Sequence, residues 1–259
     1  MHPATIPDAH CHLDLLADPE GAIETALAAG VGPILAVGTE QSASERALEL
    51  RQKYPGNVLV AVGVHPSTIP NLDDDALEAE LEYVERTLAS ADALGEVGLD
   101  FKDAPDDRQR ERQRRALDRQ LEWAAQKRKP VSAHCRRAER EIVDRMADFV
   151  RRTSLGVNLH WFTHSEKLAC QCAKHGLYIS PGPSILHSEP QAQVARAIDD
   201  AWLLVETDSP VEFQGEPAQP AWARRVAERL AVLRGVPFEN LAALLQDNFR
   251  RYLGAPGHS

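Results

Sequence analysis

The sequence predicts an α/β protein built as a single (β/α)8 barrel, a TIM barrel, with its active site at the carboxyl ends of the strands. Three observations support this fold. Short runs rich in Val, Ile, Leu and Ala alternate with longer polar stretches of helical periodicity. The length of 259 residues is typical of one such barrel. No linker or change of composition divides the chain, so residues 1–259 are expected to form one domain.

Eight segments have the composition and length of buried parallel strands. They are 6–13, 32–39, 58–66, 93–100, 129–135, 156–162, 177–182 and 202–210. Eight strands complete the ring of a barrel. The alternative is an open doubly wound sheet, which should carry a glycine-rich phosphate loop after its first strand, and the sequence has none there.

Helices are predicted between these strands, where Leu, Ala and Val recur at three- and four-residue spacings. Gly30, Gly156 and Gly176 follow helical stretches, at the position where a left-handed residue commonly ends a helix. The predicted helical segments are 41–53, 74–90, 107–127, 137–151, 165–175, 189–199, 220–234 and 238–246.

The composition excludes several classes of protein. With 43% hydrophobic residues the chain can bury a core, which excludes disorder. The sequence has neither a run of 18 apolar residues nor the basic, then apolar start of a signal peptide, so no membrane contact is predicted. The net charge of −10 argues against a large basic surface for polyanions. The four cysteines are expected to remain reduced, which indicates a cytoplasmic protein.

Polar side chains gather near the predicted carboxyl ends of the strands, where barrel enzymes bind their substrates. His10 and His12 are two residues apart in an extended strand, so their imidazoles share one face and suit a divalent metal ion. Glu96 stands among small apolar residues, where a carboxylate is costly unless it is paired or ligating. The other residues at strand ends are His65, His134, His160, Glu206 and Asp208.

Six of these side chains are too many for one tetrahedral ion and suit two divalent ions, with Mg²⁺, Mn²⁺ and Zn²⁺ as candidates. Any one histidine could instead be a core residue, but their recurrence at separate strand ends favours a metal centre. The first ion is expected to bind His10, His12 and Asp208. The second is expected to bind His134 and His160, and Glu96 is expected to bridge the two ions.

Further roles are expected around this centre. Asp208 is the candidate general base and, with Glu96, a catalytic residue. Glu206 is expected to orient a ligand or a water, with a structural salt bridge as the alternative. His65 either contacts a phosphate oxygen or only caps the mouth. Arg136 is a candidate phosphate clamp, because a guanidinium binds phosphate through two hydrogen bonds.

Three other features have two interpretations each. Trp161 and Phe162 are placed either to stack a base at the mouth or to pack in the core. His164 is either an extra contact or a solvent-exposed loop residue. The basic run RQRERQRR at 108–115 is either a solvated helix face or a rim that follows a phosphate backbone.

The motifs DAHCHLD, GVHP, GEVGLD, AHCRRA, LHWFTHS and ETDSP, in this order, resemble those of the TatD-type metal-dependent deoxyribonucleases of the amidohydrolase superfamily. The resemblance spans essentially the whole chain, including QDNFRRYLG near its end. It implies hydrolysis of DNA phosphodiester bonds, often from the 3′ end, and metal ligands at the same six positions. The chain departs from the family pattern at His164 and in VEFQGEPAQP after ETDSP, which lacks the usual basic residues, as in a divergent branch.

We therefore expect a deoxyribonuclease that acts on DNA ends or short single strands. Two divalent ions bring four positive charges, of which Glu96 and Asp208 offset two, so a cationic mouth in an acidic protein should favour a frayed end over an intact duplex. One alternative is a related barrel hydrolase of another ester or amide, although these usually bridge their metals with a carboxylated lysine. Another is a metal-binding subunit of a larger nucleic-acid-processing or defence complex.

Overall fold

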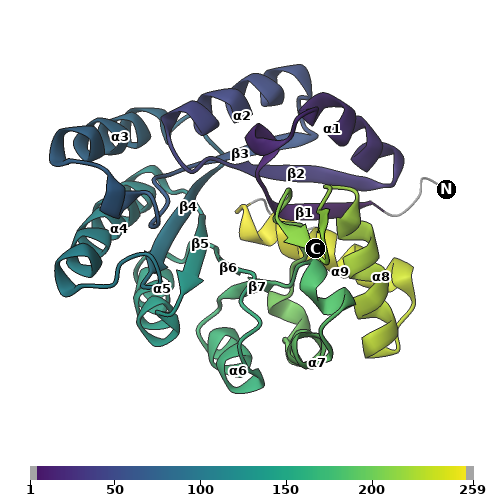
Figure 1. Cartoon of the computed structure of the whole chain (residues 1–259). Helices are drawn as coiled ribbons and strands as arrows, with labels where there is room; N and C mark the ends of the chain where they lie inside the picture. Colours follow the sequence, from purple (N-terminus) through teal and green to yellow (C-terminus); the bar gives the residue numbers. More distant parts are fainter. Residues whose placement is uncertain (1–4, 255–259) are drawn as a thin grey trace.

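The computed structural model describes residues 5–254. Within this range seven parallel strands form one sheet in which each strand pairs with the next along the chain. The sheet curls into a nearly closed barrel (Figure 1). The strands are β1 (Ile6–Cys11), β2 (Val31–Val37), β3 (Val58–Val62), β4 (Ala93–Asp100), β5 (Val131–Arg136), β6 (Val157–His160) and β7 (Tyr178–Ser180). The alternating α/β barrel predicted from the sequence is confirmed.

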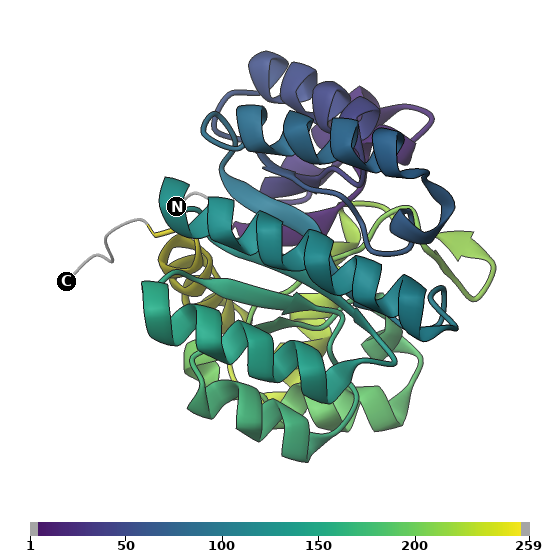
Figure 2. The ribbon, with the colours of Figure 1, turned by 90° about the vertical axis from the view of Figure 1, so that its left-hand side faces the viewer.

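Helices follow the strands and cover the outside of the barrel (Figures 1 and 2). The first of them, α1, was expected only as a helical stretch before Gly30, without bounds, and α9 continues to Tyr252 instead of ending at residue 246. The α-helices are α1 (Pro19–Ala28), α2 (Gln41–Lys53), α3 (Asp74–Thr87), α4 (Asp107–Lys127), α5 (Glu139–Thr153), α6 (Glu166–Lys174), α7 (Glu189–Ala197), α8 (Trp222–Arg234) and α9 (Phe238–Tyr252).

The predicted eighth strand, residues 202–210, is not a regular strand in the structure. It nevertheless fills the gap between β7 and β1, because it forms hydrogen bonds with both. The N–H of Leu204 donates to the carbonyl of Ile179 at 2.9 Å, and the N–H of Asp208 donates to the carbonyl of His10 at 2.9 Å. We call residues 203–209 the closing segment.

Two features of the closing segment explain why it forms no continuous ladder. The N–H of Thr207 donates to the side chain of Asp8 at 3.0 Å instead of to a backbone carbonyl, and the Thr207 hydroxyl donates to the same carboxylate at 2.5 Å. Asp208 has a φ of 50°, which lies outside the β region. The ring is therefore closed partly through a side chain of β1.

One of the three predicted helix-ending glycines has a different role. Gly30 and Gly176 have φ values of 76° and 72° and follow helices, as predicted. The left-handed residue after α5 is instead Ser154, with a φ of 57°. A Cβ atom at Gly156 would lie 2.2 Å from the carbonyl oxygen of Tyr252, so this glycine permits the close approach of α9.

Apolar side chains fill the space between the sheet and the helices and also the interior of the barrel. The interior cluster includes Ala9, Leu35 and Leu204, and it is closed by Phe249 and Tyr252 of α9. This cluster leaves the other end of the barrel, where the strands end, open to polar side chains.

A short hairpin follows the closing segment and was not predicted. Its strands, β8 (Glu212–Phe213) and β9 (Glu216–Pro217), pair antiparallel. The two residues between them, Gln214 and Gly215, have φ values of 55° and 84°, as in a type I′ turn. Figure 2 shows this hairpin, in light green, projecting at one end of the barrel. No helix of residues 5–254 is long and apolar enough to cross a membrane.

Candidate metal centre

The carboxyl ends of the strands surround a cavity of about 700 Å³. His10 and Glu206 lie beneath this cavity and are fully buried. Seven other residues singled out from the sequence line it: His12, His65, Glu96, His134, Arg136, His160 and Asp208. The structure thus brings residues that are up to 198 positions apart in the chain to a single site.

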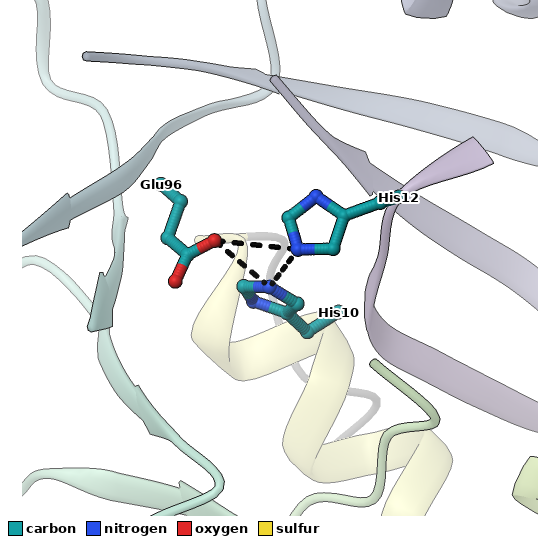
Figure 3. A group of neighbouring side chains, drawn as sticks. All are labelled: His10, His12 and Glu96. Atoms are coloured by element: carbon teal, nitrogen blue, oxygen red, sulfur yellow. Dashed lines mark hydrogen bonds and ion pairs between the residues drawn. The ribbon is translucent and has the colours of Figure 1, made fainter. Parts of the chain in front are cut away.

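One oxygen of the Glu96 carboxylate faces His10 of β1 and His12, which directly follows that strand. Its Oε2 lies 3.3 Å from Nε2 of His10 and 3.4 Å from Nε2 of His12, and these two nitrogens lie 3.3 Å apart (Figure 3). Oδ1 of Asp208 completes the group, at 3.6 Å from Nε2 of His10 and 3.3 Å from Nε2 of His12. We call His10, His12 and Asp208 the inner group.

The other oxygen of Glu96 faces a second set of imidazoles. Its Oε1 lies 2.8 Å from Nδ1 of His134 and 2.8 Å from Nε2 of His160, and these two nitrogens lie 3.1 Å apart. The same oxygen lies 3.1 Å from Nε2 of His65, which occupies the loop after β3. We call His134 and His160 the outer group.

The donor atoms of both groups fit divalent cations. Donors bound about 2.0–2.1 Å from a tetrahedral ion lie about 3.3 Å from one another, which is close to the spacings given above. Two neutral imidazoles that face each other at this distance need a proton or a cation between their lone pairs. Sets of three side chains whose donor atoms all lie within 4.8 Å of one another are His10–His12–Glu96, His65–Glu96–His134 and His10–His160–Glu206.

The pKa values of the three inner side chains are shifted in different ways. Burial, together with the charge of His160, lowers the pKa of His10 to about 4. Burial also acts to lower the pKa of His12, but the hydrogen bond to Asp208 and the charge of Glu96 outweigh it and raise that pKa to about 9. Burial opposes ionisation of Asp208, yet the hydrogen bond to His12 and the nearby imidazoles lower its pKa.

Glu96 and the outer group form a coupled set of charges. Burial alone would raise the pKa of Glu96, but the surrounding imidazoles hold it well below its usual value. In return, and against the effect of burial, the carboxylates raise the pKa of His160 strongly and that of His134 as well. Burial lowers the pKa of His65. Glu96 is therefore ionised and balanced only by imidazoles.

The second ring nitrogen of each inner histidine is held in place. Nδ1 of His10 lies 3.1 Å from the hydroxyl of Ser132, and Nδ1 of His12 lies 3.2 Å from the carbonyl oxygen of Val37, to which it donates in the Nδ1–H tautomer. Both contacts leave Nε2 directed at Glu96. Partners of this kind orient metal-ligating histidines.

The outer histidines have carboxylate partners instead. Nε2 of His134 lies 3.2 Å from Oδ2 of Asp100, and Nδ1 of His160 lies 3.5 Å from Oε1 of Glu206. The other oxygen of Glu206 accepts a hydrogen bond from Ser180, and burial raises the pKa of Glu206 to about 7. Asp100 was not identified from the sequence, although it ends β4 and the rule used for the other strand ends applies to it.

Comparison with known proteins shows what kind of protein this is. A family model described as TatD related DNase matches residues 7–254. The chain belongs to this family. It is 35% identical to the uncharacterized metal-dependent hydrolase YjjV of Escherichia coli, over 96% of this chain and 98% of YjjV. It is 30% identical to human deoxyribonuclease TATDN3, over 93% of this chain and 92% of the human protein.

Solved structures agree with this assignment. The crystal structure of YjjV matches with a TM-score of 0.84 at 33% identity, over 98% of this chain and 99% of that structure. A TatD family protein of Entamoeba histolytica, at 17% identity, shares the fold with a TM-score of 0.80. The resemblance inferred from the motifs is confirmed, and the chain is a metal-dependent hydrolase of the TatD family.

The arginine side chains of this TatD-family chain differ in whether a carboxylate already pairs with them. Arg136 is exposed at the end of β5, lines the cavity and pairs with no carboxylate within residues 5–254. The basic run 108–115 lies on α4, where Arg112 pairs with Asp74 and Arg114 pairs with Glu141. These ion pairs favour the solvated helix face as the interpretation of that run.

The two aromatic residues after β6, Trp161 and Phe162, lie in different environments. Trp161 lines the cavity, whereas Phe162 is buried in the core. His164 is exposed at the edge of the cavity, and its Nδ1 lies 3.7 Å from Oε1 of Glu139. The base-stacking interpretation therefore concerns Trp161, and core packing describes Phe162.

Proposed function

We propose that this TatD-family hydrolase cleaves DNA phosphodiester bonds, as an exonuclease acting from 3′ ends, with two divalent ions held by the inner and outer groups. The observation that carries the proposal is that the two oxygens of Glu96 face different sets of imidazoles. A carboxylate so placed suits two ions about 3.5–4 Å apart, the arrangement typical of phosphate ester hydrolysis. The name of the relative TATDN3, a deoxyribonuclease, supports DNA as the substrate.

When bound, divalent ions lower the pKa of a bound water and neutralise charge that develops on the phosphate. Asp208, whose Oδ1 lies 3.3 Å from Nε2 of His12, would act as the general base toward the attacking water. Its carboxylate is ionised at neutral pH because the hydrogen bond to His12 lowers its pKa against the effect of burial. The same carboxyl group can then pass the proton to the leaving oxygen.

His65 and Arg136 have different roles in the proposed site. His65 has Nε2 on Glu96 at 3.1 Å and Nδ1 at 2.7 Å from the hydroxyl of Ser67, so both ring nitrogens are occupied. We therefore assign His65 to holding Glu96, and not to the phosphate contact considered from the sequence. Arg136, which has no carboxylate partner in the described part of the chain, is the cation available to a phosphate.

The size and charge of the mouth favour DNA ends. A cavity of about 700 Å³ is within the range of small-molecule sites, about 300–1,000 Å³, and accommodates a nucleotide rather than a length of duplex. The net charge of −10 repels a long polyanion away from the site. No lysine lines the cavity in the described residues, which counts against relatives that bridge metals with a carboxylated lysine.

A direct test uses 3′-labelled and 5′-labelled single-stranded and double-stranded DNA with Mg²⁺, Mn²⁺ or Zn²⁺. The wild type should shorten single strands and frayed ends from the 3′ side, and Glu96→Ala and Asp208→Ala should be inactive. Glu139→Ala, which removes a carboxylate near the mouth but outside both groups, is the control and should remain active. A wild type that binds metal and opens other esters or amides, but cuts no DNA, contradicts the proposal, as does one that is inert on all substrates.

A further inference from the structure

We propose that Trp161 is a stacking surface for the nucleobase next to the scissile phosphate, and that the β8–β9 hairpin holds its indole in place. This inference rests on the proposed function, since it states which part of a DNA end the cavity recognises. Five observations support it: the position of Trp161, its backbone, its aromatic neighbour, the charges of the mouth and the apolar edge of the mouth.

Trp161 stands directly after His160, so its side chain is next to the metal centre and lines the same cavity. Its N–H donates to the carbonyl of Ser180 at 3.0 Å, and its own carbonyl accepts from the N–H of Thr163 at 3.0 Å. Its φ is 46°, a conformation that bulky residues rarely adopt. Such a conformation persists where the surroundings enforce it, and it is concentrated at functional sites.

The hairpin supplies the aromatic neighbour. The ring of Phe213 lies 5.2 Å from that of Trp161, tilted by 47°. The hairpin starts at the metal centre, because the N–H of Val211 donates to the carbonyl of Asp208 at 2.9 Å and the N–H of Ala218 donates to that of Val211 at 3.0 Å. Trp161 lines the cavity and Phe213 does not, so Phe213 supports the indole from outside and leaves it available to a ligand.

The charges of the mouth indicate how a DNA end lies there. Residues 203–223 contain no Lys or Arg, and the hairpin exposes Glu212 and Glu216. A phosphate backbone is therefore disfavoured on the hairpin side. Arg136 ends β5, on the other side of β6 in the strand order. The terminal nucleotide is thus expected on the side of Trp161, with the rest of the strand passing over Arg136.

The exposed edge of the mouth is apolar where a base would enter. Leu15 is 62% exposed and lines the cavity together with Val211. Aromatic side chains bind bases of any identity, because every base has a π face. A site of this kind recognises a planar base without reading its sequence, as a general exonuclease requires.

The kinetic test compares oligonucleotides that end in a normal 3′ nucleotide with oligonucleotides that end in an abasic tetrahydrofuran residue. Trp161→Ala should raise KM about tenfold or more on the normal end, the usual size of a stacking contact, and leave the abasic end unchanged. Trp161→Phe should restore most of the loss, and Phe213→Ala should show a smaller effect of the same kind. Trp222→Ala, which removes an indole that does not line the cavity, is the matched control and should change neither.

A binding test separates this inference from the proposed function. Calorimetry measures the affinity of the full chain for dTMP and for the 5-phosphate of the abasic tetrahydrofuran residue, which has hydrogen in place of the base. Wild type should prefer dTMP about tenfold, and Trp161→Ala should lose the preference. If the wild type cleaves no DNA, the proposed function fails while this comparison still decides the stacking site. An equal preference for dTMP in wild type and Trp161→Ala overturns the inference, as does a variant that weakens normal and abasic ends alike.

Discussion

The inner and outer groups of the metal centre share Glu96 but are built differently. The inner group comes from β1 and the closing segment, which are hydrogen bonded to each other, and His10 at its base is fully buried. The outer group comes from the ends of β5 and β6, and the side chains of His134 and His160 are 16% and 6% exposed. The inner group therefore depends on closure of the ring, whereas the outer group depends on the regular pairing of β5 with β6.

The two groups also differ in what holds their histidines. A hydroxyl and a backbone carbonyl hold the inner imidazoles, and the carboxylates of Asp100 and Glu206 hold the outer ones. Carboxylate partners make an imidazole a more basic ligand. This effect strengthens metal binding by the outer group, but exposure governs how readily an ion exchanges. We therefore expect the buried inner group to retain its ion firmly and the outer group to exchange its ion with the solvent.

The largest effect is expected at the residue that both groups share. Glu96→Ala removes the carboxylate common to both, so DNA hydrolysis should fall by more than about 10³-fold, since losing even an indirect partner of a metal ligand costs about 10–100-fold. Metal content by mass spectrometry should fall for both groups. A Glu96→Ala protein that keeps its metal and a tenth of its activity would show that the groups do not share Glu96.

Single histidine variants should separate the two groups. His134→Ala should keep about one ion per chain and lose at least about 10²-fold in activity, because only the outer group is damaged. His10→Ala should lose the firmly held ion. Metal content after dialysis against a weak chelator measures both. The distinction between the groups is wrong if the two variants lose metal equally at every chelator concentration.

A smaller effect is expected at a partner of the outer group. Asp100→Asn keeps the size of the side chain but removes the charge beside His134, so activity should fall about 10–100-fold. Asp103→Asn, a neighbouring carboxylate outside the site, is the control. If Asp100→Asn were as active as the control, the contact with His134 would have no role in orienting that imidazole.

The smallest effect on activity is expected at the closure of the ring. Asp8→Asn weakens the hydrogen bonds to Thr207. Because the N–H and hydroxyl of Thr207 stay buried with a poorer partner, the free energy of unfolding should fall by about 1–3 kcal/mol. Thermal unfolding should shift by about 2–4 °C for each kcal/mol in a chain of this size. Thr207→Val is the reciprocal variant. An unchanged midpoint in both would show that the closing segment does not need Asp8.

The sequence predicted the barrel and the positions of the candidate ligands for one reason. In a parallel barrel the strand ends meet at one face, so histidines and carboxylates at the ends of strands as distant as β1 and β6 had to lie together. The roles of His10, Glu96 and Asp208 as ligands remain part of the proposal.

Other features depend on contacts that sequence patterns do not contain. The eighth strand was expected because residues 202–210 begin with the apolar run WLLV, but a side chain of β1 takes one of its hydrogen bonds and Asp208 leaves the β region. Gly156 looked like a helix end, whereas its role depends on the approach of Tyr252 from a distant helix. Ser132 has no signal in the sequence, because only the orientation of the His10 ring gives it a function.

The most direct test of the central claim is anomalous diffraction from crystals grown with Mn²⁺ or Zn²⁺. Two peaks about 3.5–4 Å apart are expected. One should lie within bonding distance of Glu96 Oε2 and the inner group, and the other within bonding distance of Glu96 Oε1 and the outer group. A single peak at full occupancy, or two peaks that are not both bonded to Glu96, would contradict the claim that this carboxylate joins two metal sites.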